Sequence, residues 1–291
     1  MTTLKSVFPL TTVLFVLFVL WYGFAAWMNS PLQRDLYANN DRTDYTTSDL
    51  IVDSLNMERP KLPAPHQIAA ELYKLVIETP PTSKRGLVYH ATITLEETLI
   101  GFFFGAAFGI GLAVMIQSMR TLERSMMPWI VASQTVPIIA LAPMIVVILN
   151  QFNITGLAPK AVIAAYLSFF PITVGMVKGF RSPDPLQIDL MRTYSATRGQ
   201  VMAKLRLPAS LPFFFASMKI GAAAALVGAI VAEVTKSEDG GLGARLLAGS
   251  YYGQTVQIWA ALFAATALSA GLVGLIALAG RIVLRRMAFS Q

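Results

Sequence analysis

Residues 98–119 read TLIGFFFGAAFGIGLAVMIQSM, a run without a single charge between Glu97 and Arg120. About 20 consecutive apolar residues are enough for a helix to cross a bilayer, so this run predicts one span. The rest of the chain follows the same pattern. Of its 291 residues 55% are hydrophobic and 13% are charged, whereas a soluble domain carries about 25% charged residues. The composition predicts an all-α integral membrane protein.

Similar apolar runs recur along the chain and predict six transmembrane helices. We place them near residues 8–28, 96–117, 129–149, 161–179, 213–234 and 257–280. The alternative for the first run is a cleaved signal peptide. Its apolar core is longer than a signal peptide needs and no A-x-A site follows it, so a retained helix is favoured.

The positive charges predict the orientation of these spans. Lys and Arg gather in the segments that alternate spans place on one side, residues 1–7, 118–128, 180–212 and 281–291. Because such segments stay in the cytoplasm, we expect both termini inside and an even number of spans. The net charge of +7 is then a membrane signature, and no nucleic-acid partner is expected. With no cysteine and two histidines, the chain predicts no disulfide, no metal site and no cofactor.

The external segment 29–87 is the most polar part of the chain. Residues 29–59 are rich in Asp, Asn and Thr, so we expect coil with one short helix there. A second, amphipathic helix is predicted near 66–78, with Pro65 in its first turn. We treat the chain, 1–291, as one transmembrane domain.

The second span carries a pattern that predicts close helix packing, and the third carries one that predicts a translocation pathway. Gly101, Gly105 and Gly109 repeat every four residues, which predicts a smooth face where a neighbouring helix packs closely. Gln134 and Thr135 precede Pro137 well inside the third span. Because a proline removes a helix hydrogen bond, polar groups beside a kink point to a translocation pathway. The alternative is that Gln134 only bonds a neighbouring helix. Phe169 and Phe170, beside Pro171 in the fourth span, are weaker pathway candidates.

Few ionisable groups lie at membrane depth. Lys178 and Lys219 lie near the cytoplasmic ends of their spans, close enough for the charged groups to reach the membrane surface. Glu233 lies near the outer end of the fifth span, and Glu96 and Glu97 open the second span. We expect none of them to have a buried partner, which argues against a proton relay. The chain also lacks a P-loop, H-E-x-x-H and G-x-S-x-G. No catalytic residue is therefore predicted, and the chain should not hydrolyse ATP itself.

The cytoplasmic loop 181–212 carries the most information about function. It is polar and basic, and two short helices fit it, from Pro185 to about Tyr194 and from about Arg198 to Leu205. We expect Leu207-Pro208 to end the second one. Two short amphipathic helices facing the cytoplasm would make a docking surface for a partner. The alternative is a connector that lies on the membrane surface.

This loop resembles the coupling loop in the membrane-spanning permease subunit of bacterial ABC importers. That family has the pattern Glu-Ala-Ala, three residues, Gly, nine residues, Ile, one residue, Leu-Pro. Here Asp189-Leu190-Met191 stands for Glu-Ala-Ala, Ser195 for Gly and Leu205 for Ile, with Leu207-Pro208 in register. The spacing fits without a gap, although the identities differ.

Further matches extend the resemblance over about residues 60–285, to the nitrate, sulfonate, taurine and pyrimidine-precursor branch of the family. They are Leu62-Pro-Ala-Pro65, Gly101-Phe-x-x-Gly105, Gly109-Ile-Gly111, Pro137-x-x-Ala140-x-Ala142-Pro143, Phe169-Phe170-Pro171, Val231-Ala-Glu233 and Gly241-Leu-Gly243. The segment 29–59 departs from the short connection usual in that branch, and it could contact the external binding protein.

The resemblance implies a set of partners in the bacterial inner membrane. These are a second permease chain, identical or not, two cytoplasmic ATPase chains, an external substrate-binding protein and membrane lipid. The loop 189–208 would sit in a groove of the ATPase, with Asp189 and Ser195 positioning its helix. Arg192 and Arg198 would pair with acids of the ATPase. Leu205, Leu207 and Pro208 would supply its apolar footing.

Other readings of the sequence remain open. The chain could be a secondary transporter or channel working alone, although the long basic loop argues against it. A membrane-embedded enzyme should show clustered acids, bases or metal ligands, and none is visible. The stretch Ser133-Gln-Thr-Val-Pro137 lacks the Arg often present in sulfonate-type members. This favours a heteroaromatic solute, such as a pyrimidine precursor of thiamine or a flavin, over a sulfonate- or nitrate-type anion.

Overall fold

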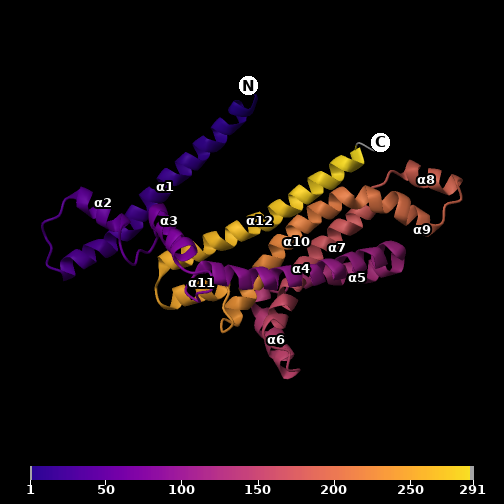
Figure 1. Cartoon of the computed structure of the whole chain (residues 1–291). Coiled ribbons are helices and arrows are strands. Elements are labelled where there is room, and N and C mark those ends of the chain that lie inside the picture. The colour runs from indigo at the N-terminus through magenta and orange to yellow at the C-terminus, as the bar shows by residue number, and fades with distance from the viewer. Residues whose placement is uncertain (1, 289–291) are drawn as a thin grey trace. The chain divides into compact units, whose positions relative to one another are not determined.

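In the computed structural model, which describes residues 2–288, the described part of the chain is helical throughout and contains no strand (Figure 1). The all-α prediction is confirmed. The helices are α1 (Thr2–Asn39), α2 (Thr47–Leu55), α3 (Pro65–Tyr73), α4 (Leu87–Ser118), α5 (Arg120–Ser133), α6 (Ile138–Gln151), α7 (Leu157–Phe180), α8 (Pro185–Thr193), α9 (Arg198–Val201), α10 (Leu207–Thr235), α11 (Leu242–Tyr251) and α12 (Thr255–Ala288), with π-helical turns at Lys74–Glu78 and Met202–Arg206. Among the described residues, five helices are long and apolar enough to cross a membrane, and the number of spans is six if α5 and α6 together count as one.

The chain divides into two compact units. The first contains the residues up to Tyr89 together with Arg245–Ala264, and the second contains His90–Ala244 and α12 from Ala265 onward. The second unit holds most of the apolar spans and the coupling-loop segment.

The core of the second unit is built from α4, α7 and α10. Helices α7 and α10 lie against each other along their length. The glycine face of α4 lies on α7: a Cβ on Gly109 would come within 2.7 Å of the Phe169 carbonyl oxygen, and one on Gly101 or Gly105 would overlap α7 atoms. Only a residue without a side chain allows this approach, as expected for small-residue helix packing in membranes.

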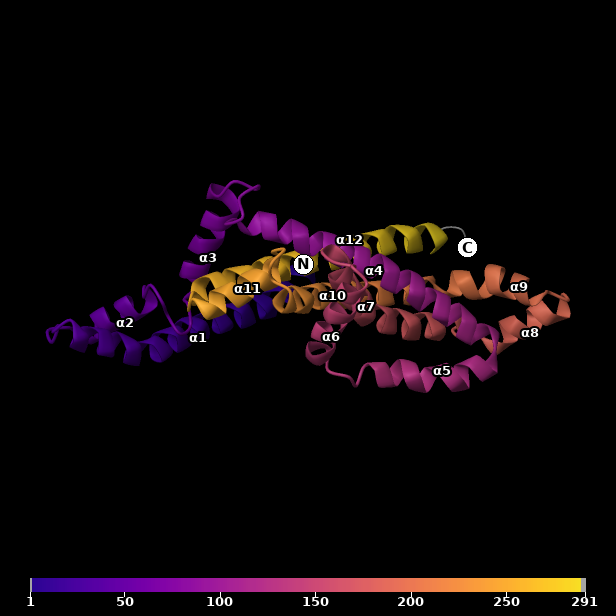
Figure 2. The same cartoon turned by 90° about the horizontal axis from the view of Figure 1, so that it is seen from below.

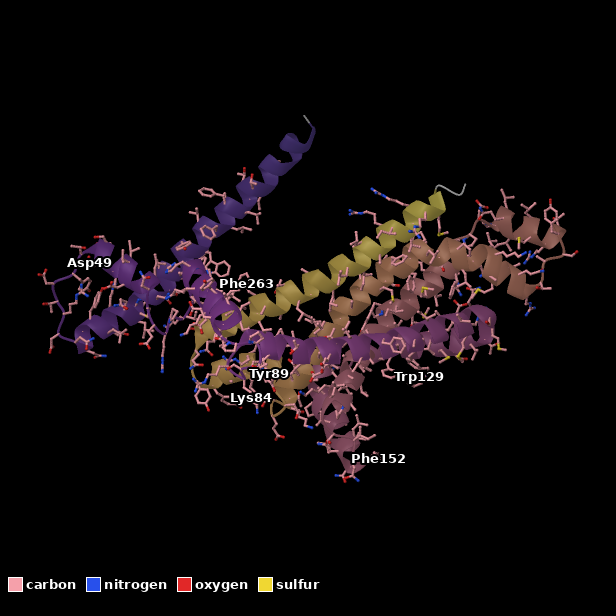
Figure 3. All side chains as sticks on the ribbon, in the orientation of Figure 1. Asp49, Lys84, Tyr89, Trp129, Phe152 and Phe263 are labelled. Atoms are coloured by element: carbon pink, nitrogen blue, oxygen red, sulfur yellow. The ribbon has the colours of Figure 1, made fainter. Side chains whose placement is uncertain are left out.

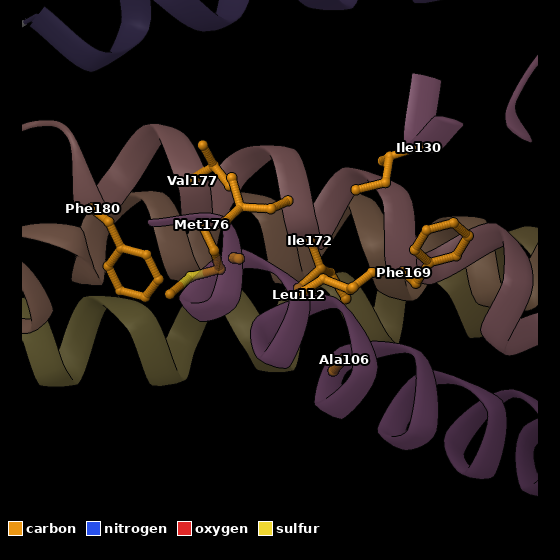
Figure 4. Close-up of a cluster of buried hydrophobic side chains, with 10 residues drawn as sticks. Ala106, Leu112, Ile130, Phe169, Ile172, Met176, Val177 and Phe180 are labelled. Atoms are coloured by element: carbon orange, nitrogen blue, oxygen red, sulfur yellow. The ribbon is translucent and has the colours of Figure 1, made fainter. Parts of the chain in front are cut away.

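Further along the same helices, larger side chains fill the interface. Ile172, Met176 and Phe180 of α7 are almost fully buried and meet Leu112 of α4 and Ile130 of α5 (Figure 4). The interior of this unit therefore changes from glycine contacts at one end of α4 to branched and aromatic side chains at the other.

The single kinked helix expected at 129–149 is wrong in detail. The chain forms α5 and α6, which are bent by 100° at residues 134–137 (Figure 2). Pro137 is the cap residue before α6 and has no N–H to continue α5. Its carbonyl oxygen instead accepts hydrogen bonds from the N–H groups of Ala140 and Leu141. The proline signal was correct, but it marks a break and not a kink.

The first unit is organised around Asn29, which is fully buried in α1. Its amide donates to the carbonyl oxygens of Ser54 and Leu62, and its Oδ1 accepts from the N–H groups of Lys61 and Leu62 at 2.9 and 3.1 Å. One side chain thus satisfies one carbonyl group of α2 and three backbone groups of the loop before α3. This loop is further held by the indole N–H of Trp21, which donates to the Pro63 carbonyl oxygen.

The sequence predictions for this unit are partly confirmed. A helix does begin at Pro65, and it continues as a π-helical turn to Glu78. Residues 29–59 contain more helix than expected, because α1 runs on to Asn39 before α2 begins. The side chain of Asp49 closes a capping box with Thr46, and the hydrogen bonds from Thr46 hold the pKa of that carboxyl below its usual value.

Candidate functional site

Helix α8 begins with strong local signals. The Asp184 carboxylate accepts the N–H of Leu186 at 2.8 Å, and the Gln187 side chain returns to accept the N–H of Asp184. This is a capping box, which satisfies donors that a helix start leaves free. Pro185 occupies the first turn, where its fixed φ fits a helix and its missing N–H costs nothing. The sequence therefore forms α8 with little help from packing.

The end of α8 is set by Ser195. Its φ is +53°, a left-handed conformation that favours glycine. The N–H of Ser195 donates to the Arg192 carbonyl oxygen at 2.8 Å, and the N–H of Ala196 donates to that of Met191 at 3.0 Å. This hydrogen-bond pair is the Schellman motif that ends many helices. Ser195 thus occupies a position where a glycine would fit better, the position at which the resembling family has its Gly.

No residue of α8 is buried. Leu186, Leu190 and the adjoining Tyr194 are 77%, 56% and 77% exposed. Their spacing of four residues places them along one helix face. Beside this stripe, Arg192 Nη1 lies 3.0 Å from Asp189 Oδ1. The stripe is the most evident functional feature of the loop, and its spacing could have been read from the sequence.

The second helix of the loop differs from its prediction. Thr197 caps α9, but the helix does not end at Leu207-Pro208. It continues through the π-helical turn Met202–Arg206 into α10, of which Pro208 is the second residue. Leu205 is half-buried and Leu207 is 44% exposed. Helix α9 is therefore continuous with α10.

Several side-chain contacts tie this loop back to the core of the second unit. Arg206 Nη1 donates to the Phe180 carbonyl oxygen at 3.1 Å, and Ser182 Oγ donates to that of Ala209 at 3.3 Å. Arg181, just after α7, forms an ion pair with Glu123 of α5 at 2.5 Å. A displacement of the loop would therefore be felt by α7, α10 and α5 together.

The pathway candidates fall into two groups. Gln134, Thr135 and Pro137 lie at the exposed break between α5 and α6. On the neighbouring part of α5, Trp129 is 78% exposed, and Phe152 after α6 is 72% exposed (Figure 3). Large exposed aromatic side chains on α5 and at the far end of α6 are suited to lipid or to a partner chain, since no described residue covers them.

Phe169 and Phe170 are placed differently. Phe169 is 8% exposed and meets the ring of Phe108 on α4 edge to face. Phe170 is half-buried and packs against the same cluster. The link between the two groups is Tyr166, whose ring contacts Phe169 and whose hydroxyl donates to the carbonyl oxygen of Ser133 at the end of α5. Sequence reasoning missed Tyr166 because a single tyrosine in an apolar run carries no pattern.

The expectation that the charged groups in the spans lack buried partners is wrong for Glu97 and Glu233. Lys160 Nζ lies 2.9 Å from Glu97 Oε1, and both side chains are almost fully buried. Glu233 accepts hydrogen bonds from the Thr94 hydroxyl and the Gly243 N–H. The sequence placed Lys160 in a loop, and nothing in it indicated which carboxylate the lysine would meet.

Comparisons with known proteins agree with the fold. Residues 105–289 match the family model described as "Binding-protein-dependent transport system inner membrane component". A "Probable ABC transporter permease protein" of Haemophilus influenzae is 29% identical over 61% of this chain and 68% of its own length. The "Formylaminopyrimidine transport permease protein ThiX" of Halalkalibacterium halodurans is 32% identical over 62% of this chain and 67% of its own length.

A solved structure of the MetNI methionine ABC transporter, in an inward-facing conformation, has a chain with the same fold. Its TM-score is 0.57 at 22% identity, and the match covers 69% of the present chain and 95% of that chain. At this identity the likeness concerns the fold alone. It extends the agreement from sequence to the arrangement of helices.

Proposed function

This chain belongs to the binding-protein-dependent transport system inner membrane components and is the permease of an ABC importer, and on that premise we propose that α8 and α9 are its docking surface for the ATPase. It is a multi-pass, non-catalytic subunit of the inner membrane, and an ATPase and a binding protein are its partners. The proposal concerns which residues carry the coupling, how the chain is oriented and which path the solute takes.

The exposed stripe of Leu186, Leu190 and Tyr194 is the observation that carries the docking proposal. Helix α8 has no buried residue, and three large apolar side chains on one of its faces are exposed to water. This exposure is unfavourable unless a partner covers the side chains. The helix is preformed by its capping box and its Schellman end, so little entropy is lost when it binds. An amphipathic helix lying in a groove of a partner is a common recognition mode.

The predicted coupling residues take definite roles on this surface. Asp189 and Arg192 flank the stripe and are exposed, as is Arg198 at the start of α9. Ser195 sets the angle between the two short helices. Leu205, Leu207 and Pro208 join the loop to α10, so movement of the ATPase passes directly into a span. This coupling would bias the helices between two arrangements.

The orientation follows from the same assignment. Docking to a cytoplasmic ATPase places α8 and α9 inside, which agrees with the positive-inside distribution and with both termini in the cytoplasm. The α5–α6 break, with Gln134, Thr135 and Pro137, is then the most polar interruption of the spans. We assign it to the translocation pathway, with Phe169 and Phe170 behind it. A second permease chain, identical or not, would complete the path.

The solute class is proposed on two grounds. The 133–137 stretch carries no cation, and the related ThiX protein is by its name a formylaminopyrimidine transport permease. Both favour a neutral heteroaromatic solute, such as a pyrimidine precursor or a flavin, over a sulfonate or nitrate. Uptake of labelled solutes of each class by cells with and without the chain distinguishes them. Uptake of an anion alone would overturn the assignment.

The docking proposal is tested by Leu190→Glu. A charge in the stripe should abolish co-purification of the ATPase and reduce uptake at least tenfold, because a carboxylate in an apolar interface loses its hydration. The matched control is Gln187→Glu, which adds the same charge to the same helix and keeps the acceptor of its capping box. Equal loss of the ATPase in both variants, or in neither, would contradict the role of the stripe.

Coupling itself is tested by Asp189→Lys and Ser195→Lys, in which ATP hydrolysis should continue while uptake is lost. A stand-alone secondary transporter, the alternative suggested by the sequence alone, would instead keep its uptake in all of these variants.

A further inference from the structure

Buried charges gather at the end of the α4–α7–α10 core that lies away from α8. Lys160, in the first turn of α7, is fully buried, and its Nζ lies 2.9 Å from Glu97 Oε1 on α4. Glu233, near the end of α10, is also fully buried. Thr94, which precedes Glu97 by about one turn of α4, donates its hydroxyl to Glu233, so the two carboxyl groups meet the same part of α4. Two carboxyl groups and one ammonium group thus share a site without solvent.

The hydrogen bonds of Glu233 come from neutral donors. The Thr94 hydroxyl donates to its Oε1 at 2.6 Å, and the Gly243 N–H donates to its Oε2 at 2.6 Å. These donors suit an ionised carboxylate, but they bring no positive charge. Glu233 therefore has to be neutralised by the groups that it shares with Glu97.

The other charged groups around the site do not supply the missing charge. Asp239, in the loop after α10, lies 3.6 Å from Lys160 and 3.7 Å from Lys236, so it brings its own negative charge and its own cation. On α4, His90 Nδ1 accepts the N–H of Gly241 at 3.0 Å. A ring nitrogen that accepts a hydrogen bond carries no proton, so the His90 ring is neutral. Fully ionised, the site holds one positive charge too few.

One atom shows where that charge belongs. Glu97 Oε2 is buried and no N–H or O–H group of the described residues donates to it, while its partner oxygen already accepts from Lys160. A buried carboxylate oxygen without a donor is costly. A hydrogen bond between two carboxyl groups requires that one of them is protonated, as in paired carboxylates that cannot both ionise.

We propose that Glu97 and Glu233 form a buried proton-binding site, in which Glu97 Oε2 carries a proton and donates it to the ionised carboxylate of Glu233. The ligand is one proton from solvent, and no bond other than this O–H is made. With it, the positive charge of Lys160 balances the negative charge of the pair and every oxygen of the two carboxyl groups has a partner. The site joins α4, α7 and α10 at this end, and it is independent of the docking role of α8.

The proton links the stability of the core to pH. The folded chain holds a proton that the unfolded chain releases near neutral pH, so the folded state binds more protons. Stability then falls as the pH rises and the site loses its proton. Stability falls in this direction because the carboxyl oxygens of the site all have hydrogen-bond partners only when the site is protonated.

The direct test is infrared spectroscopy of the full-length chain, purified in lipid nanodiscs with its partner subunits. A protonated, buried carboxyl group has a C=O stretch that ionised carboxylates lack. We expect this band at neutral pH in the wild type, its decrease at alkaline pH, and its absence from Glu97→Gln. Glu96→Gln, which changes the adjacent exposed residue, should retain the band. A wild type without the band, or a band unchanged in Glu97→Gln, would overturn the proposal.

Thermal unfolding provides the second arm. The amide introduced by Glu97→Gln would imitate the protonated carboxyl, with an oxygen for Lys160 and an NH₂ group to donate to Glu233. The melting temperature of the wild type should fall from neutral to alkaline buffer more than that of Glu97→Gln, while Glu96→Gln should follow the wild type. The alternative cation is Na⁺. A wild-type melting temperature that rises with NaCl, but not with equal choline chloride, at fixed pH would overturn the assignment to a proton.

Discussion

Two contacts between a basic side chain and a carboxyl group in the second unit have almost the same length and opposite surroundings. Lys160 and Glu97 are 2.9 Å apart with side chains 0% and 2% exposed, whereas Arg192 and Asp189 are 3.0 Å apart with side chains 75% and 62% exposed. The first pair lies among packed helices and the second on a helix with no buried residue. Judged by distance alone, the two pairs would contribute equally to stability.

Burial separates their contributions. Breaking a buried pair leaves an uncompensated charge without water, which typically costs about 3–5 kcal/mol. An exposed pair contributes about 0–1 kcal/mol, because water solvates each partner alone. Substitutions in the α4–α7–α10 core should therefore change stability, and substitutions on α8 should change partner binding.

The largest effect is expected from Lys160→Met, which keeps most of the side-chain volume and removes the charge. Glu97 and Glu233 then lose the fully buried cation that they share, and unfolding should become easier by about 3–5 kcal/mol. Denaturation of the detergent-solubilised protein measures this. The control is Lys178→Met, which removes an exposed lysine near the other end of the same helix. A difference below about 1 kcal/mol between the variants would show that burial adds nothing to the contribution of Lys160.

A smaller effect is expected on the glycine face of α4. A Cβ at Gly105 would overlap Ser168 and the backbone of Ala165, whereas one at Gly111 would meet nothing within 4 Å. Gly105→Ala should cost about 1–3 kcal/mol by forcing α4 away from α7. Gly111→Ala should stabilise by up to about 1 kcal/mol, since alanine favours helix. Melting temperatures that move in the same direction would disprove the close contact.

These two regions also differ in how far they could be predicted. The ends of α8 follow from local chemistry, and the helix predicted from Pro185 to about Tyr194 agrees with the observed Pro185–Thr193 to about one residue. The spans follow from apolar runs, as does the glycine face of α4. Such features depend on neighbours in the sequence, and the sequence therefore shows them.

The contacts that depend on distant residues could not be predicted. Lys160 and Glu97 are 63 residues apart and Thr94 and Glu233 are 139 apart, and no spacing rule connects them. The break at residues 134–137 was foreseen only as a kink, because a proline shows where a helix is interrupted and not how far the next one turns. The continuation of α9 into α10 was missed because Leu207-Pro208 was taken as a stop, whereas the helix runs on through the π-helical turn before it.

On the α8 side, Ser195→Gly should be mildly stabilising. A non-glycine residue in the left-handed region is strained by about 1 kcal/mol or slightly more, part of which is offset by the greater freedom of glycine when unfolded. Amide exchange in α8 should slow by a few-fold, with no change in α4 or α7. Thr193→Gly, inside the last turn, should speed the same exchange. Slower exchange in both variants would argue against strain at Ser195.

The smallest change in stability, and the sharpest test of the division, is expected from Arg192→Ala. Removal of an exposed partner at this spacing should alter the free energy of unfolding by no more than about 0.5 kcal/mol. If Arg192 pairs with an acid of the ATPase, uptake should still fall several-fold and recover in Arg192→Lys, because the positive charge returns. Arg286→Ala, which removes an exposed cation near the end of α12, is the control for a general loss of charge. Normal uptake in Arg192→Ala would confine docking to the apolar stripe. A loss of stability as large as that of Lys160→Met would mean that exposure does not decide how much such a contact contributes to stability in this protein.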